Sequence, residues 1–338
     1  MNKYLIKYPH HKYALESNSG IALLKILESR FAYPFDNYWE QFGYRIGGPV
    51  CYGFTKWILN EVTSKKENIS DIIFVARDGY LLQKILELLP HSGKIKSHYV
   101  YAPRILISKL KNLDLRNNYK EYIANLFIGK GAVAVVDTVT LNFSSMKLIA
   151  MNIPNKIYGL FWTKLRSLQQ NVFNFTYSTF QKEDYHKIYC WNLIEFILTS
   201  PEPPLSDWNG NTPIFQKVDY YESERKKIFL QIENGVLNFV QDVLKIDSEL
   251  EFTNDFITKW VNSFLKRPNN ADISAFKNIM FSELEDHSDI IPLDPFEKIG
   301  SRFLLKKIKD RLWLFSQRHP FLYFVLHKGK SLYTFLRK

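Results

Sequence analysis

The chain has 338 residues, 46% of them hydrophobic, and a formal net charge of +11 at pH 7. This length and apolar content can supply a large buried core, and they exclude an intrinsically disordered protein. No apolar run approaches the roughly 18 residues that a membrane-spanning helix needs, and the N-terminus lacks a signal-peptide pattern. The two cysteines, Cys51 and Cys190, have no metal-ligand spacing and fit a reducing compartment.

The first 70 residues predict helices. Apolar residues recur at helical spacing over 20–31 and 51–66, and the glycine- and proline-containing stretch 43–50 between them predicts a turn. From 71 to 165, short apolar strands at 71–76, 97–102, 131–137 and 156–162 alternate with helical segments, which is typical of a parallel sheet with crossover connections. A polar stretch at 109–122 predicts a loop followed by a helix.

The remainder of the chain again predicts helices. They are expected over 189–200, ended by a proline-rich segment, and then over 222–245, 254–267 and 271–284. We therefore expect four regions: an N-terminal helical segment at 1–50, an α/β core at 51–205, a helical region at 206–300, and a basic tail at 301–338.

Two junctions between a strand and a helix carry the chemistry. The first apolar strand runs directly into Arg77, Asp78 and Gly79. The third strand ends in Asp137, and a polar loop with hydroxyl and amide side chains follows before a helix that begins near Ser145. In a parallel sheet both loops lie at the carboxyl ends of strands, where such folds bind ligands. Backbone N–H groups at a helix start, supplemented by hydroxyls, suit a phosphate group.

This pair of junctions, 60 residues apart from Arg77 to Asp137, resembles the donor site of type I phosphoribosyltransferases. The stretch IIFVARDGYLL is similar to the loop that binds pyrophosphate, and VAVVDTVTLNFSS to the loop that binds the ribose 5-phosphate. A closer resemblance is to bacterial polysaccharide-locus proteins with an ARDGY motif, which are glycan phosphoribosyltransferases; YVYAPR (99–104) and IEFILTSPEPP (194–204) also look like positions of that family. Motifs of nucleobase-salvage enzymes are absent.

The resemblance implies an α/β fold of the type I phosphoribosyltransferase kind, with additional helical segments at both ends. It also implies a Mg²⁺-dependent enzyme that transfers 5-phosphoribose from phosphoribosyl pyrophosphate (PRPP) to a hydroxyl of a lipid-linked glycan, inverting to a β-linked product. A separate sugar-phosphate phosphatase would then complete the incorporation of ribofuranose into an O-antigen or capsule.

The resemblance assigns roles by position. Arg77, Asp78 and Asp137 are expected to be catalytic, and Glu195 is the candidate acceptor base. No residue is expected to bind the metal directly, although Asp78 or Asp137 would hold it through water. The expected donor-binding residues are Arg77, Asp78, Gly79, Tyr80, Arg104, Asp137, Thr138, Thr140, Asn142, Ser144 and Ser145.

The basic tail predicts a peripheral location. Residues 301–338 contain ten Lys or Arg against one acidic residue, Asp310, interleaved with leucines and aromatics. Such a segment fits an amphipathic helix on anionic lipid, at the inner face of the cytoplasmic membrane, or a domain helix with a solvated basic face. The density of apolar residues argues against nucleic acid as a partner.

Two alternative functions remain open from the sequence. In a phosphatase of the haloacid-dehalogenase type, Asp137 would be the nucleophile, but the second aspartate expected two residues later is replaced by Val139. The other alternative is a non-catalytic assembly factor that binds the donor without turning it over.

Overall fold

The computed structural model describes residues 3–30, 35, 37–64, 68–90, 95–102, 113–126, 129, 131–140, 143–164, 175–181, 192–209, 212–281, 291–293 and 295–296. The contacts divide the chain into two compact units, Met1–Pro295 and Phe296–Lys338. The predicted tail at 301–338 lies outside the described residues, as do Arg104 and Asn142. The helices and strands given below all belong to the first unit.

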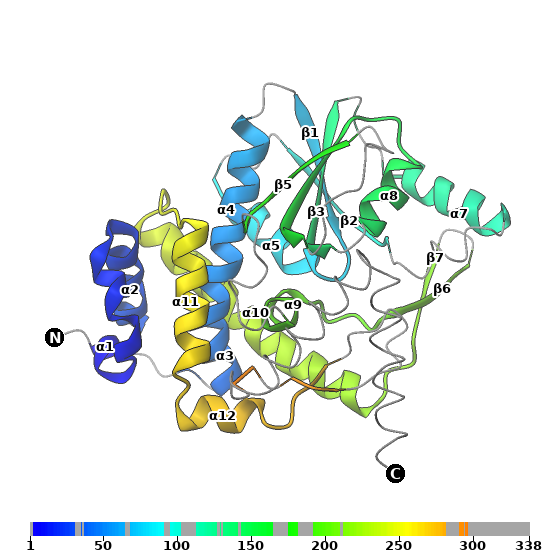
Figure 1. Cartoon of the computed structure of the whole chain (residues 1–338). Helices are drawn as coiled ribbons and strands as arrows, with labels where there is room; N and C mark the ends of the chain where they lie inside the picture. Colours follow the sequence, from blue (N-terminus) through cyan, green and yellow to red (C-terminus); the bar gives the residue numbers. More distant parts are fainter. Residues whose placement is uncertain are drawn as a thin grey trace, which may run out of the picture. The chain divides into compact units, whose positions relative to one another are not determined.

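A five-stranded parallel sheet forms the centre of this unit (Figure 1). Its strands lie in the order β2-β1-β3-β4-β5. Their bounds are β1 Ile69–Val75, β2 Lys96–Val100, β3 Ala132–Thr140, β4 Ile157–Lys164 and β5 Phe175–Thr179. The predicted α/β class, a parallel sheet flanked by helices, is confirmed, and the arrangement is consistent with a phosphoribosyltransferase-like or other Rossmann-type fold.

Helices cover the two faces of the sheet (Figure 1). Because alternate residues of a strand point to opposite faces, Ile73 and Val135 share one face, where they form a core cluster with Tyr119 of α7 (Leu113–Ala124) and Met146 of α8 (Ser144–Ala150). The other face is covered by α4 (Gly48–Ser64), α5 (Gly79–Leu88) and α9 (Asn192–Leu198), with Trp162 of β4 fully buried there against Phe54.

The remaining helices come from both ends of the unit and pack together beside the sheet (Figure 1). Two short antiparallel ladders complete the unit: β6 with β7, and β8 with β9. In chain order these elements are α1 Lys3–Lys7, a 3₁₀ segment Pro9–Glu16, α2 Asn18–Arg30, α3 Tyr38–Phe42, a π-helical segment Gly43–Gly47, β6 Leu205–Asn209, β7 Thr212–Phe215, α10 Tyr220–Ile246, α11 Asn254–Lys266, α12 Asn270–Phe276, β8 Met280–Phe281 and β9 Ile291–Pro292.

The turn predicted at residues 43–50 is wrong, because the chain is helical from Tyr38 to Ser64. The glycines serve close packing instead of reversing the chain. A Cβ atom at Gly43 would collide with the Ile232 backbone of α10, and one at Gly235 would collide with the carbonyl oxygen of Glu40. Glycine therefore lets α10 approach the α3 segment more closely than any other residue would allow.

Three further local predictions differ from the structure. The helix expected over 271–284 ends at Phe276, and Met280–Phe281 instead pairs with Ile291–Pro292. Neither β5 nor the β6–β7 hairpin was predicted, because their sequences lack a regular alternation of apolar and polar residues.

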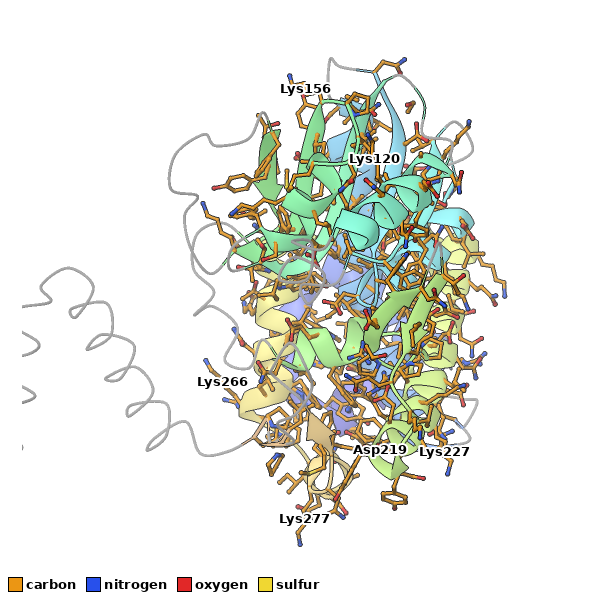
Figure 2. The ribbon with its side chains drawn as sticks, turned by 90° about the vertical axis from the view of Figure 1, so that its right-hand side faces the viewer. Lys120, Lys156, Asp219, Lys227, Lys266 and Lys277 are labelled. Atoms are coloured by element: carbon orange, nitrogen blue, oxygen red, sulfur yellow. The ribbon has the colours of Figure 1, made fainter. Side chains whose placement is uncertain are left out.

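A buried carboxylate organises the amino edge of the sheet, at the opposite end of the strands from the predicted site. Figure 2 shows this edge at Lys156, one residue before β4, far from Asp219 at the start of α10. Asp71 of β1 is fully buried and accepts hydrogen bonds from Ser70 Oγ (2.5 Å), His98 Nε2 (2.7 Å) and the Gly129 N–H (3.1 Å). Burial alone would raise the pKa of Asp71, but these hydrogen bonds lower it overall.

We expect the substitution Asp71→Asn to destabilise the protein by about 1–3 kcal/mol near neutral pH, because hydrogen bonds to a charged group are lost. Since the pKa of Asp71 is lower in the folded state, its contribution is present above the unfolded pKa of about 4 and is lost as the pH falls through the folded value. Urea unfolding as a function of pH will test this. The difference between the two proteins should shrink below about pH 4, whereas Asp255→Asn, at an exposed site, should follow the wild type throughout.

Candidate functional site

The predicted junctions meet at the carboxyl edge of the sheet. From β1 the chain crosses to β2 on one side and then to β3 on the other, so a topological switch point lies between β1 and β3. Ligands of open parallel sheets bind outside such a point. In Figure 1 the carboxyl ends of the strands face α9 and α10, which bound this edge.

Arg77 lies immediately beyond β1 and contacts elements far along the chain. Its Nη1 donates to Glu222 Oε1 of α10 at 3.3 Å and to the carbonyl oxygen of Glu202 at 3.4 Å. The peptide bond between Ala76 and Arg77 is cis. Burial and the neighbouring Arg225 guanidinium lower the pKa of Arg77, against the opposing effect of Glu222. The site therefore holds a mostly buried cation, 22% exposed, that is paired with Glu222.

Arg225 of α10 fixes the loop that follows α9. Its Nε donates to both carboxylate oxygens of Glu222, at 3.0 and 2.9 Å. Its Nη1 and Nη2 donate to the carbonyl oxygens of Ser200 at 2.7 Å and Glu202 at 2.8 Å. Two guanidinium groups thus share the carboxylate of Glu222, and Arg225 makes the closer contacts to it.

Two tyrosines at the end of the neighbouring strand hold the side chain of Glu202: Tyr99 within β2 and Tyr101 just beyond it. The phenol of Tyr99 donates to Glu202 Oε2 at 2.9 Å, and that of Tyr101 donates to Oε1 at 2.7 Å. Burial and the adjacent Glu202 carboxylate raise the pKa values of both phenols above their ordinary range, so both stay protonated and act as donors. The loop after α9 is therefore attached to the end of β2 as well as to α10.

The other residues of the first junction have mainly packing contacts. Gly79 is buried, and a Cβ there would come within 2.7 Å of Phe74 Cβ, so close approach of α5 to β1 already requires glycine. The Tyr80 ring packs edge-on against Tyr99, with ring centroids 5.9 Å apart. Asp78 precedes α5 but makes no capping hydrogen bond through its side chain.

The second junction adjoins the first through the register of β1 and β3. Phe74 pairs with Val136, so Asp137 follows beside Val75, two residues before Arg77. Its Oδ1 accepts a hydrogen bond from the N–H of Thr138 at 2.9 Å. Arg77 therefore follows β1, and Asp137 lies near the carboxyl end of the adjacent strand β3, on the two sides of the switch point.

The strand that carries Asp137 extends further than predicted. Thr138 and Thr140, expected in the loop, belong to β3, and both are buried. Thr140 Oγ1 accepts from the N–H of Phe143, whose φ of 56° and ψ of 35° place it in the left-handed region before α8. Oγ1 of Thr138 is buried without a hydrogen-bond partner. Ser144 begins α8, and Ser145 is buried in its first turn.

Several residues that shape the site were not predicted: Tyr99, Tyr101, Glu202, Glu222 and Arg225. The first three lie in the two stretches that resemble family positions, 99–104 and 194–204, so a signal was present for them. Glu222 is separated from Arg77 by 145 residues, and only the fold brings the two together. The predicted base Glu195 lies in the first turn of α9 and is partly exposed, although buried apolar residues surround it in the helix.

Within the described ranges, no group of three or more His, Cys, Asp or Glu residues is arranged to hold a metal ion. A search of the same ranges for a helix long and apolar enough to cross a membrane finds none.

Comparison with known proteins gives little information. No family model matches the chain. A guanine exchange factor for Rac, number 30, of Dictyostelium discoideum is 32% identical over 85 residues. These residues make up 25% of this chain and 5% of that protein, so the chain spans about a twentieth of the length of this relative.

Proposed function

We propose that the protein is a glycan phosphoribosyltransferase that transfers 5-phosphoribose from PRPP to a sugar hydroxyl. One observation supports the proposal: the half-buried Arg77 follows β1, and Asp137 lies near the carboxyl end of the adjacent parallel strand β3, on the two sides of a topological switch point. A donor that carries a diphosphate at one end and a ribose phosphate at the other matches two neighbouring polar junctions of this kind.

Breaking the bond between the anomeric carbon and the diphosphate develops negative charge on the leaving group. Arg77 is the cation at the β1 junction, and a planar guanidinium can donate two parallel hydrogen bonds to phosphate oxygens. Because Arg225 already binds Glu222, Arg77 can release this carboxylate and turn to the diphosphate without leaving an unpaired anion behind.

At the second junction, Asp137 accepts the ribose hydroxyls, and the chain around Ser144 receives the 5-phosphate. Bound Mg²⁺ would supply further charge neutralisation on the diphosphate. Mg²⁺ usually binds through one or two carboxylates together with substrate phosphates and water. The single carboxylates Asp78 and Asp137 at the two junctions would suit such water-mediated contact.

The acceptor that we propose is a lipid-linked glycan, and a separate phosphatase would remove the 5-phosphate afterwards. The basic tail at 301–338 would bring the enzyme to the anionic membrane surface at which such acceptors lie.

The first experiment measures donor binding and turnover. We expect PRPP with Mg²⁺ to bind the full chain in calorimetry, and diphosphate to be released when lipid-linked glycan is added. Asp137→Ala should weaken PRPP binding by roughly tenfold or more, which corresponds to about 1.4 kcal/mol, because the ribose hydroxyls lose their acceptor. Asp255→Ala, at an exposed aspartate of α11, should bind PRPP like the wild type.

Three outcomes would contradict the proposal. Absence of PRPP binding removes the donor site. Tight binding without diphosphate release over a panel of glycan acceptors would favour a donor-binding assembly factor. Hydrolysis of p-nitrophenyl phosphate that is lost in Asp137→Asn would favour a phosphatase.

A further inference from the structure

We propose that Glu202 is the base of an acceptor subsite and that its carboxylate takes the proton of the sugar hydroxyl that attacks the donor. This inference rests on the proposed function, and it assigns the role that the sequence predicted for Glu195. It follows from the position of Glu202, its hydrogen bonds, and the aromatic rings beside it.

Glu202 adjoins the cation of the donor site. Its backbone carbonyl lies 3.4 Å from Arg77 Nη1, while its side chain reaches toward the end of β2. The residue is partly exposed, so a substrate can reach it. A group that accepts the acceptor proton must lie close to the bond that breaks, and Glu202 meets this requirement through its contact with Arg77.

The hydrogen bonds of Glu202 leave part of its carboxylate available. A carboxylate has about four acceptor positions, and the phenols of Tyr99 and Tyr101 occupy one on each oxygen. Burial keeps both phenols protonated, so they orient the carboxylate without neutralising it. The remaining positions can accept a hydrogen bond from a sugar hydroxyl.

The other glutamate beside Arg77, Glu222, is less available as a base. Glu222 accepts hydrogen bonds from both Arg77 and Arg225. The hydrogen bonds to the carboxylate of Glu202 come from neutral phenols instead. Glu202 can therefore receive a proton without giving up an ion pair, whereas Glu222 cannot.

A row of aromatic rings adjoins this carboxylate. Tyr80, Tyr99, Tyr101 and Phe215 follow one another edge to face, with successive ring centroids 5.9, 5.5 and 5.7 Å apart. Rings of this kind combine an apolar face with a polar phenol. They match a sugar, which has apolar C–H faces and hydroxyl edges, better than they match a charged or wholly apolar ligand.

In the proposed step, the acceptor oxygen forms a bond to the anomeric carbon of the donor. The bond from that carbon to the diphosphate breaks, and its electron pair leaves with the diphosphate. The hydroxyl proton passes to the carboxylate of Glu202, which returns it to solvent after the products leave.

The test is Glu202→Gln, which removes the proton acceptor but can keep a hydrogen bond to either phenol. We expect turnover to fall by roughly 10²–10⁴-fold, with PRPP binding within about threefold of the wild type. Glu202→Asp, which keeps a carboxylate but shortens its side chain, should recover part of the rate that Glu202→Gln loses. The double variant Tyr99→Phe/Tyr101→Phe should also lower turnover without weakening PRPP binding, because the carboxylate loses the two phenols that orient it. Glu249→Gln, at an exposed glutamate, should leave the rate unchanged.

The outcomes separate the two proposals. If the wild-type protein releases no diphosphate from PRPP with any glycan acceptor, the proposed function fails and this inference fails with it. If the wild type turns over and Glu202→Gln retains its rate, only the role of Glu202 is overturned. A folded Glu202→Gln protein that has lost PRPP binding would likewise overturn the role as base and assign the residue to the donor.

Discussion

Replacing Arg77 with alanine is expected to slow diphosphate release by roughly 10²–10³-fold while leaving the protein folded. Removing one preorganised group that stabilises developing charge commonly costs on the order of 10²–10³ in rate, and Arg77 is the cation at the β1 end of the proposed donor site. The fold should tolerate the change because Glu222 keeps its hydrogen bonds to Arg225. Steady-state diphosphate release and urea unfolding, measured on the same preparation, test both halves of this expectation.

Two further variants sharpen this experiment. Arg77→Lys keeps the charge but loses the planar arrangement of donors, so it should recover only part of the rate. Arg267→Ala removes an exposed arginine at the end of α11 and should behave as the wild type. A near-wild-type rate in Arg77→Ala would show that this residue does not belong to the site. Partial recovery of the rate in Arg77→Lys would show that Arg77→Ala loses activity because the charge is missing, and not because the fold is destabilised.

The fold class could be predicted because the strands of the sheet have a recognisable local sequence pattern. β1, β3 and β4 are buried on both faces and read as continuous apolar runs, each followed by polar residues at its carboxyl end. The carboxyl ends of parallel strands share one edge of a sheet, so the two junctions could be joined from the sequence pattern. The strand order then places Arg77 and Asp137 near the carboxyl ends of neighbouring strands.

The surroundings of Arg77 could not be predicted in this way. Glu222 and Arg225 lie on α10, where they look like ordinary charged residues at helical spacing. Their roles depend on how α10 crosses the carboxyl edge of the sheet. The position of α10 relative to the sheet cannot be predicted from the local sequence pattern. The same reason explains the choice of Glu195 over Glu202: an acid on an apolar helix is conspicuous in sequence, whereas an acid between prolines resembles a surface turn.

The glycines at 43–48 show a different limit. Glycine followed by proline is a strong local indicator of a turn, but here Gly43 and Gly48 face α10 at distances that exclude a side chain. Tertiary packing has overridden the local preference, and the sequence alone cannot tell a glycine that bends the chain from one that admits a neighbouring helix.

The second prediction with a large effect concerns a buried ion pair in the helical part of the unit. Asp272 of α12 is 1% exposed, and its Oδ1 accepts hydrogen bonds from Arg45 Nη2 at 2.8 Å and from Tyr38 OH at 2.9 Å. Its Oδ2 accepts from the N–H of Asn269, which completes a capping box at the start of α12. Arg45 is equally buried and lies over the ring of Tyr8, with 4.0 Å between the guanidinium carbon and the ring centroid.

Asp272→Ala should therefore lower the free energy of unfolding by about 3–5 kcal/mol, because it leaves the Arg45 guanidinium buried without its partner. Chemical denaturation followed by tryptophan fluorescence is a suitable measurement, since Trp260 donates a hydrogen bond to the Arg45 carbonyl and reports on this region. Asp255→Ala, an exposed aspartate in the first turn of α11, should cost no more than about 1 kcal/mol. The double variant Arg45→Met/Asp272→Ala tests why Asp272→Ala lowers the free energy of unfolding. If the unpaired charge of Arg45 is responsible, the double variant should be more stable than Asp272→Ala alone. If the losses in free energy from the two substitutions add, the packing of the two side chains, and not their charges, stabilises the helical layer.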